Sequence, residues 1–240
     1  MRKKTVRRAE PDSNSNAQLQ PWQVEFAHDL PDVPVLPETL LRLDLEAQER
    51  CIDLRGISRV VLSDVGATVQ VLRLSGLESS CMESRLTRIE DCISDLGVSA
   101  CLAAVSAETI GRDYRYEVIA EIWAHSREIA HCAKLVAEEA YDVNPDDAYL
   151  VGLLHTIGLL PHALGWNGSG RPVDGALAGL QLARQWSLPN AAVEYFRELH
   201  RDECAAPWPE IVHKAHRLAN GSSIHCPLEQ EMRPQLYRAV

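Results

Sequence analysis

Hydrophobic residues along this chain recur at the three- and four-residue spacing of amphipathic helices, and no segment alternates convincingly as a half-buried strand would. The longest helical pattern covers residues 114–140. Its apolar stripe steps by 4, 3, 4, 3 and 4 residues through Val118, Ile122, His125, Ile129, Cys132 and Val136. The spacing predicts one long helix with a single buried face, and a histidine lies within that face.

A second helix is predicted to begin at Pro145. Asn144 is a preferred N-cap residue, proline suits the first turn, and Asp146 and Asp147 suit the positive end of the helix dipole. The residues that share one face are Ala148, Val151, Gly152, His155 and Leu159. The two small residues of this face would let a neighbouring helix approach closely, and the face contains a second histidine, His155.

Capping and breaking signals divide the rest of the chain into further helices. The predicted ranges are 37–48, 55–63, 66–76 after a Ser63-Asp64 cap, a helix between a Thr87–Glu90 capping box and Gly97, 98–110, 174–186, 189–200 and 207–220. The pattern predicts an all-α protein with two helical lobes, residues 26–112 and 113–220, and a hinge at Gly111-Arg112-Asp113. Residues 1–25 are expected to be a flexible basic leader, and residues 221–240 a C-terminal tail.

Charge is distributed unevenly along the chain. The formal net charge is −10, but residues 1–12 hold five basic and two acidic residues (+3), which leaves −13 for the remainder. An acidic body repels phosphate groups, so we expect no nucleic-acid partner. We see no secretory signal and no apolar run of about 20 residues, which predicts a cytoplasmic protein that does not enter a membrane.

The seven cysteines indicate reduced thiols in a protein of the cytosol. Their number is odd, no pair has the Cys-x-x-Cys spacing, and several fall on apolar helical faces. Cys81, Cys92, Cys101 and Cys132 would form a redox pair only if folding brought two of their α-carbons within about 6 Å.

The two histidines on apolar faces, His125 and His155, admit two interpretations. Such a histidine is usually a core residue whose ring bonds a carbonyl, and we take packing as the first interpretation. Metal ligation is the second, although Thr156 offers only a neutral hydroxyl where a hard cation needs an anionic oxygen. If His125, His155 and His216 converge, they would make a three-histidine zinc site with one open position.

A separate chelating set lies near the C-terminus. His200 and Cys204 are four residues apart, and His213 and His216 are three apart, spacings that place each pair on one helical face. The prolines at positions 207 and 209 interrupt this region, so a shared site is the weaker hypothesis.

Several segments, in order and spacing, resemble the HDOD domain, an output module related to the HD metal-dependent phosphohydrolases. They are Val35-Leu36-Pro37-Glu38, residues 63–75, residues 89–97, Trp123-Ala124-His125-Ser126, residues 153–158 and Trp186-Ser187-Leu188-Pro189. The resemblance covers about residues 30–220. It implies an all-α fold in which an N-terminal helical lobe packs on an HD-like helical lobe.

The metal of an HD hydrolase is held by a histidine, an adjacent His-Asp pair and a later aspartate. The resemblance places His125 and His155 at the two histidine positions, Thr156 at the paired aspartate, and His216 at the later aspartate. Both anionic ligands are therefore absent. The resemblance implies a non-catalytic regulatory module of bacterial signal transduction, with no cofactor and no metal, that acts through a protein partner or a small ligand.

Three further residues are candidates for contact with a ligand or partner. Trp123 is first of all a core anchor, like Trp186, with ligand stacking as the alternative. Arg127 is expected on a solvated helix face or beside an anionic ligand near His125, and His200 near the same pocket. The glycine-rich segment 165–170 is predicted to be a flexible connection or a lid.

Two other functions stay open at this point. One is a divergent metal-dependent phosphohydrolase that uses the histidine cluster. The other is a sensor that binds a nucleotide messenger without cleaving it, which rests on analogy with the family's signalling context.

Overall fold

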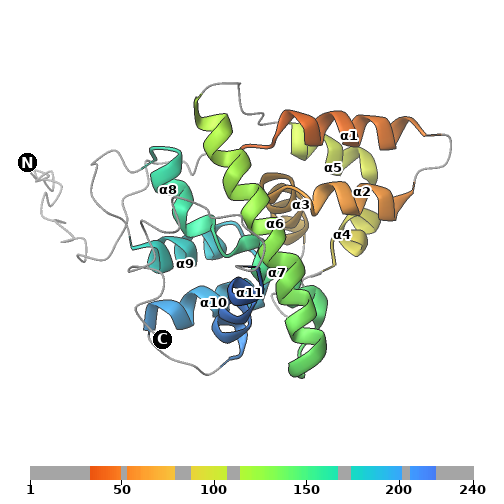
Figure 1. Ribbon diagram of the computed structural model, residues 1–240. Coiled ribbons are helices and arrows are strands. Elements are labelled where there is room, and N and C mark those ends of the chain that lie inside the picture. The colour runs from red at the N-terminus through yellow and green to blue at the C-terminus, as the bar shows by residue number, and fades with distance from the viewer. Residues whose placement is uncertain are drawn as a thin grey trace, which may run out of the picture.

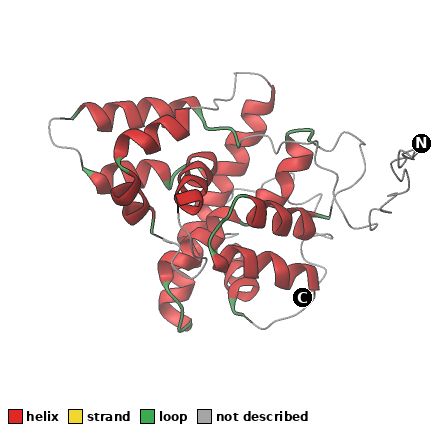
Figure 2. Ribbon diagram, turned by 180° about the vertical axis from the view of Figure 1, so that it is seen from behind, coloured by secondary structure: helices red, strands yellow, loops and turns green. Residues whose placement is uncertain are grey.

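A computed structural model describes residues 33–49, 53–78, 88–106, 114–166, 174–201 and 206–219. Within these ranges the regular structure is helical and contains no strand, as Figures 1 and 2 show, so the all-α prediction is confirmed. The helices are α1 (Pro37–Gln48), α2 (Leu54–Val61), α3 (Val65–Glu78), α4 (Ile89–Leu96), α5 (Val98–Ser106), α6 (Tyr114–Ala140), α7 (Pro145–Leu154), the 3-10 helix η2 (Ile157–Leu159), α8 (Leu160–Ala163), α9 (Gly175–Gln185), α10 (Asn190–Arg201) and α11 (Trp208–Ala219).

Helices α1 to α5 form one group, with α3 in contact with α2, α4 and α5 (Figure 1). The buried Asp64 joins this group at the start of α3, where a cap was predicted. Its carboxylate accepts hydrogen bonds from the backbone N–H groups of Leu36 (2.9 Å) and Ala67 (3.0 Å) and from the Thr39 hydroxyl (2.8 Å). Burial raises the pKa of Asp64, while these hydrogen bonds act in the opposite direction. The Asp64 side chain thus connects the segment before α1 and the first turn of α1 to the N-terminus of α3 by hydrogen bonds.

Helices α6 to α11 form the second group, in which the long α6 runs through the middle of the molecule and packs against α7 and α11 (Figure 1). Gly152 of α7 makes the close approach that the sequence predicted. A β-carbon on this glycine would lie 2.8 Å from the Ala130 α-carbon and 3.0 Å from the Ile129 carbonyl oxygen of α6. The absence of a side chain at residue 152 therefore sets how closely α6 and α7 pack.

The range predicted for the long helix is correct, but its buried face is rotated from the predicted stripe. Val118, Cys132 and Val136 are only half-buried. The buried residues of α6 are Ile119, Ile122, Trp123, His125, Ser126, Ile129, Ala130, Ala133 and Ala137. The small alanines admit α7 on their side of the helix, so burial follows the position of α7 and not the largest apolar side chains.

The predicted helix after Asn144 ends earlier than expected. Its start is as predicted, because the Asn144 side chain accepts a hydrogen bond from the Asp146 backbone N–H (2.9 Å). However, α7 ends at Leu154, and His155 is its C-cap residue, so the prediction that His155 and Leu159 continue one helical face is wrong. At this end the Gly152 carbonyl oxygen lies 2.6 Å from Nδ1 of the His155 ring, and the chain turns into η2.

Hydrogen bonds connect the two groups of helices at the turn between α2 and α3. The Tyr149 hydroxyl on α7 donates to the Leu62 carbonyl (3.1 Å), and the Arg127 guanidinium on α6 approaches the Ser63 carbonyl (3.5 Å). Burial raises the pKa of Tyr149 to about 12, so its hydroxyl stays protonated and remains a donor. The predicted hinge at Gly111 and the predicted cap Thr87 lie outside the described residues. The N-cap residue of α4 is Arg88, which makes no side-chain capping bond, so the prediction that Thr87 caps this helix is wrong.

Three cysteines are described, Cys92, Cys101 and Cys132, and none of them forms a disulfide with another described residue. Burial, with Cys92 nearby, raises the pKa of Cys101 to about 11. Cys92 and Cys101 are buried, as predicted for core thiols, and Cys132 is half-buried, whereas Cys51, Cys81, Cys204 and Cys226 lie outside the described residues.

Among the described residues, no helix is both long enough and apolar enough to cross a membrane without a break. Helices α2 and α3 together reach the required length and composition, but the pair is bent by 115°.

Candidate functional site

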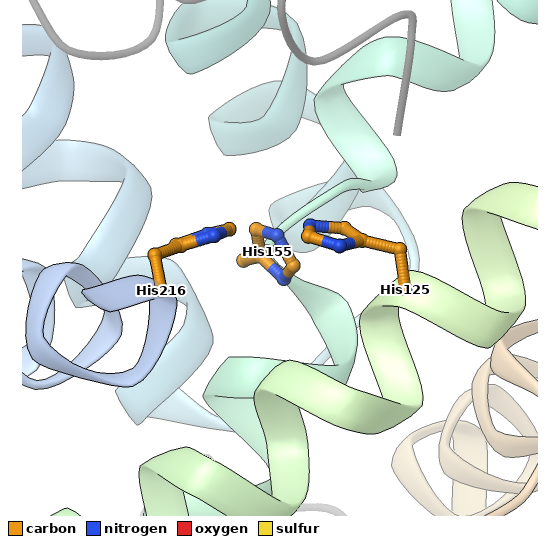
Figure 3. Close-up of side chains that lie close together, drawn as sticks. All are labelled: His125, His155 and His216. Atoms are coloured by element: carbon orange, nitrogen blue, oxygen red, sulfur yellow. The ribbon is translucent and has the colours of Figure 1, made fainter. Parts of the chain in front are cut away.

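Three histidine rings from three separate segments meet in the second group of helices, as Figure 3 shows. His125 lies on α6, His155 at the end of α7, and His216 in the last turn of α11. The ring centres are 5.3 Å apart for His125 and His155, 5.1 Å for His125 and His216, and 5.0 Å for His155 and His216. One nitrogen from each ring lies within 4.8 Å of the other two. We call these three residues the histidine cluster.

The histidine cluster is buried. The exposed fractions are 4% for His125, 1% for His155 and 7% for His216. Both α7 and α11 pack against α6, and this packing brings the three side chains together away from bulk water. In a buried group of this kind, each ring nitrogen needs a hydrogen-bond partner or a bound ion.

The contact between His155 and Gly152 determines the tautomer of the His155 ring. A carbonyl oxygen only accepts hydrogen bonds, so Nδ1, 2.6 Å from the Gly152 carbonyl oxygen, carries the proton. Nε2 of the neutral ring then carries a lone electron pair. A backbone carbonyl that orients a ring in this way is the usual outer partner of a metal-binding histidine.

Thr156, at the position of the missing aspartate, is bonded to the residue that follows His125. The Thr156 and Ser126 hydroxyl oxygens are 2.6 Å apart, and the two side chains are 1% and 0% exposed. Either hydroxyl is able to donate this bond. A neutral, mutually satisfied pair of hydroxyls therefore occupies the place where the resemblance to HD hydrolases requires a carboxylate.

The donor set of the histidine cluster has definite chemical consequences. Its three ligand atoms are imidazole nitrogens, with no carboxylate among them. Neutral imidazoles suit zinc, copper, nickel and iron, whereas magnesium and calcium prefer oxygen ligands.

The remaining predicted site residues have other contacts. Trp123 is 1% exposed and belongs to the hydrophobic core, so its surface is not available to a protein partner. Arg127 is directed to the Ser63 carbonyl. His200 lies 3.8 Å from Asp174, and the ligand group that contains His216 does not include it.

The second chelating set is tested only in part. His213 and His216 share α11, but the group formed around His216 contains His125 and His155 instead of His213. Cys204 lies outside the described residues, as do residues 167–170 of the predicted connection or lid. Trp166, which belongs to the predicted segment, packs edge-on against Trp186 with ring centres 6.3 Å apart.

Two residues next to the histidines were missed by the sequence analysis as parts of the site. Ser126 directly follows His125 just as Thr156 directly follows His155, and the two hydroxyls meet where the two histidines meet. Gly152 was singled out for packing alone, yet its carbonyl also orients His155. In the sequence a histidine is followed by a hydroxyl residue twice, at His125-Ser126 and at His155-Thr156. This repetition was the signal that could have identified Ser126 as part of the site.

A family model for the HDOD domain matches residues 33–164, more than half of the chain. The chain belongs to the HDOD family. The match includes His125, His155 and Thr156, and it ends before His216.

Solved structures extend the similarity of fold over most of this HDOD chain. A structure of the MmoQ response regulator from Methylococcus capsulatus strain Bath has a TM-score of 0.62 at 16% identity, and the alignment covers 85% of this chain and 93% of that one. A second structure of that regulator gives 0.62 at 19% identity, with 90% and 95% covered. A virulence factor from Campylobacter jejuni gives 0.50 at 16% identity, with 86% and 92% covered. No curated protein matches the chain in sequence.

Proposed function

We propose that this HDOD protein is a regulatory module that acts by binding a protein partner or a small ligand and does not cleave bonds. The observation that carries this proposal is the Ser126–Thr156 hydroxyl pair, 2.6 Å apart and buried, at the position where an HD hydrolase needs an anionic ligand. Metal-assisted hydrolysis requires a cation that polarises phosphate and activates water. A pair of hydroxyls that bond each other supplies no negative charge for the hard cations suited to that chemistry.

The contacts between the two groups of helices support a role in relaying a signal. The two groups share one hydrophobic core, and several polar contacts also join them: the Tyr149–Leu62 hydrogen bond, the Tyr116–Glu38 hydrogen bond, the Arg127 contact to the turn before α3, and an ion pair between Arg88 and Asp146 at 3.6 Å. The exposed ion pair among them contributes about 0–1 kcal/mol. A partner that binds one arrangement of the lobes more tightly than another would shift the balance between the two arrangements. The similar fold of the MmoQ response regulator is consistent with a signalling role.

One observation favours a second function, a divergent metal-dependent phosphohydrolase. The histidine cluster has the three-histidine arrangement that catalytic zinc sites use, with ligand atoms within 4.8 Å of one another. The exposed fractions of 4%, 1% and 7% count against it, because a phosphate ester would have to reach a site that the described helices cover. The regulatory function therefore has the stronger support.

A hydrolysis assay separates these two functions. The purified protein is incubated with nucleotides, cyclic dinucleotides and a chromogenic phosphodiester in the presence of zinc, manganese or magnesium. We expect no turnover above that of a His155→Ala variant. Metal-dependent turnover that His155→Ala abolishes would overturn the regulatory proposal and establish the hydrolase.

The binding role has its own test. The wild-type protein and an Arg127→Ala/Tyr149→Phe variant, which loses both side-chain contacts to the α2–α3 turn, are used to recover partners from cells of the source organism. We expect one protein to co-purify with the wild type in stoichiometric amount, and its recovery to change with the variant. A partner recovered equally by both forms would contradict the relay between lobes.

A further inference from the structure

We propose that His125, His155 and His216 bind one transition-metal ion of the zinc class, with a fourth position left for water. The proposal is independent of the regulatory function, because a module without hydrolytic activity is equally able to hold such an ion. It rests on four properties of the histidine cluster: distance, burial, orientation and donor type.

The distances are close to those of a metal site. Three nitrogens at about 2.0–2.1 Å from a tetrahedral zinc ion lie about 3.3 Å from one another. The ligand atoms of the histidine cluster already lie within 4.8 Å of one another, from three elements that pack together. Figure 3 shows the rings directed toward a common centre. To bind a zinc ion, the nitrogens would have to approach one another by up to about 1.5 Å.

Burial and orientation favour an ion over simple packing. Nε2 of His155, Nε2 of His216 and both ring nitrogens of His125 are shielded from solvent. The Gly152 carbonyl holds the proton of His155 on Nδ1, which leaves Nε2 as the ligand atom. A core built for packing alone would not need three polar rings with their centres 5.0–5.3 Å apart.

The donor set selects the ion. Three imidazoles without a carboxylate favour zinc, cobalt, nickel or copper and disfavour magnesium, manganese and calcium. The substitution of imidazole for aspartate at residue 216 therefore replaces a hard-oxygen position with a nitrogen ligand. The ion would link α6, the end of α7 and α11, three segments held in the described structure by packing and hydrogen bonds.

Metal titration of the full-length protein tests the proposal. The protein is freed of metal with a chelator and titrated with Zn²⁺ or Co²⁺, with thermal unfolding and the visible absorption of tetrahedral Co²⁺ as readouts. We expect one ion per chain, a raised unfolding temperature and no comparable effect of Mg²⁺. His125→Gln, His155→Gln and His216→Gln should each weaken binding by about 100-fold or more, since even outer partners of ligands contribute about 10–100-fold.

A matched control lies on the same helix as one of the ligands. His213 is half-buried on α11, three residues before His216, and is not part of the histidine cluster, so His213→Gln should bind the ion as the wild type does. Equal binding by the wild type and the three cluster variants, or no binding at one equivalent by the wild type, would overturn the proposal. If a cluster variant fails to fold, X-ray absorption of the zinc-loaded wild type decides the matter: three imidazole ligands support the site, and any other number overturns it.

Discussion

The hydroxyl oxygens of Ser126 and Thr156 lie 2.6 Å apart between α6 and the turn after α7, with exposed fractions of 0% and 1%. Each residue directly follows a histidine of the histidine cluster. The same packing of α7 on α6 therefore brings together both a pair of hydroxyls and a pair of rings. A hydrogen bond between neutral groups at this point keeps a buried polar position satisfied without any charge.

A double-mutant cycle measures this hydrogen bond. Ser126→Ala or Thr156→Val alone leaves one buried hydroxyl without its partner and should lower the free energy of unfolding by about 1–3 kcal/mol. The double variant replaces both hydroxyls with apolar groups of similar shape, so its loss should be smaller than the sum of the single losses. Urea unfolding measures all four forms. Strictly additive losses would mean that the two hydroxyls do not interact.

Asp64 should be the most sensitive polar residue of the first group of helices. Asp64→Ala removes the acceptor for two backbone N–H groups and for the Thr39 hydroxyl, so we expect a loss of about 3 kcal/mol or more in chemical denaturation. Asp53→Ala is the matched control. Asp53 also caps a helix, accepting from the Arg55 backbone N–H at 3.0 Å, but it is exposed and should cost about 1 kcal/mol. If both variants lost the same free energy of unfolding, burial of the Asp64 carboxylate would not explain its contribution to stability.

Gly152→Ala should disturb the contact between α6 and α7. The added methyl group would meet the backbone of α6, at 2.8 Å from the Ala130 α-carbon, and we expect a loss of about 1–3 kcal/mol. Gly97→Ala serves for comparison, because its β-carbon has open space and its cost comes only from backbone strain at φ 83° and ψ 143°, about 1–3 kcal/mol. Only the Gly152 variant should also shift the histidine ring signals in an NMR spectrum, since its carbonyl contacts His155.

Stability should fall in alkaline solution because of Cys101. Burial raises its pKa from 9.0 to about 11, so between these pH values the unfolded chain has lost the thiol proton while the folded protein retains it. Deprotonation then favours the unfolded state, and the stability present below pH 9 is lost progressively up to about pH 11. Cys101→Ala should reduce this pH dependence, as measured by urea unfolding from pH 8 upward. A variant with the same alkaline slope as the wild type would disprove the assignment.

Tyr149→Phe tests the connection between the two groups of helices. The change removes only the hydroxyl that donates to the Leu62 carbonyl, and we expect a loss of about 1 kcal/mol with faster amide exchange at the α2–α3 turn. Tyr141→Phe, at an exposed contact with Lys214, should change stability by less than about 0.5 kcal/mol. Unchanged exchange in the Tyr149 variant would show that this hydrogen bond does not connect the lobes.

The local signals in the chain were sufficient for most of the helices. The range 114–140 follows from hydrophobic spacing alone, and the start of α7 follows from Asn144 and Pro145, because caps and periodicity depend on neighbouring residues. The HDOD resemblance likewise followed from short segments in order. The sequence did not predict that α7 ends at Leu154. The contact between the His155 ring and the Gly152 carbonyl at this end depends on the direction of the His155 side chain, which the tertiary structure sets.

The histidine cluster illustrates what local sequence does not contain. The stripes of α6 and α7 indicated that His125 and His155 face the interior, and packing was the favoured interpretation for each considered alone. Whether His216 joins them depends on how α11 docks on α6, a contact between segments far apart in the chain. Periodicity predicts a helix and approximately which side of it is buried, whereas the exact buried face and its partners follow from the packing of whole helices, and only that packing places three rings around one point.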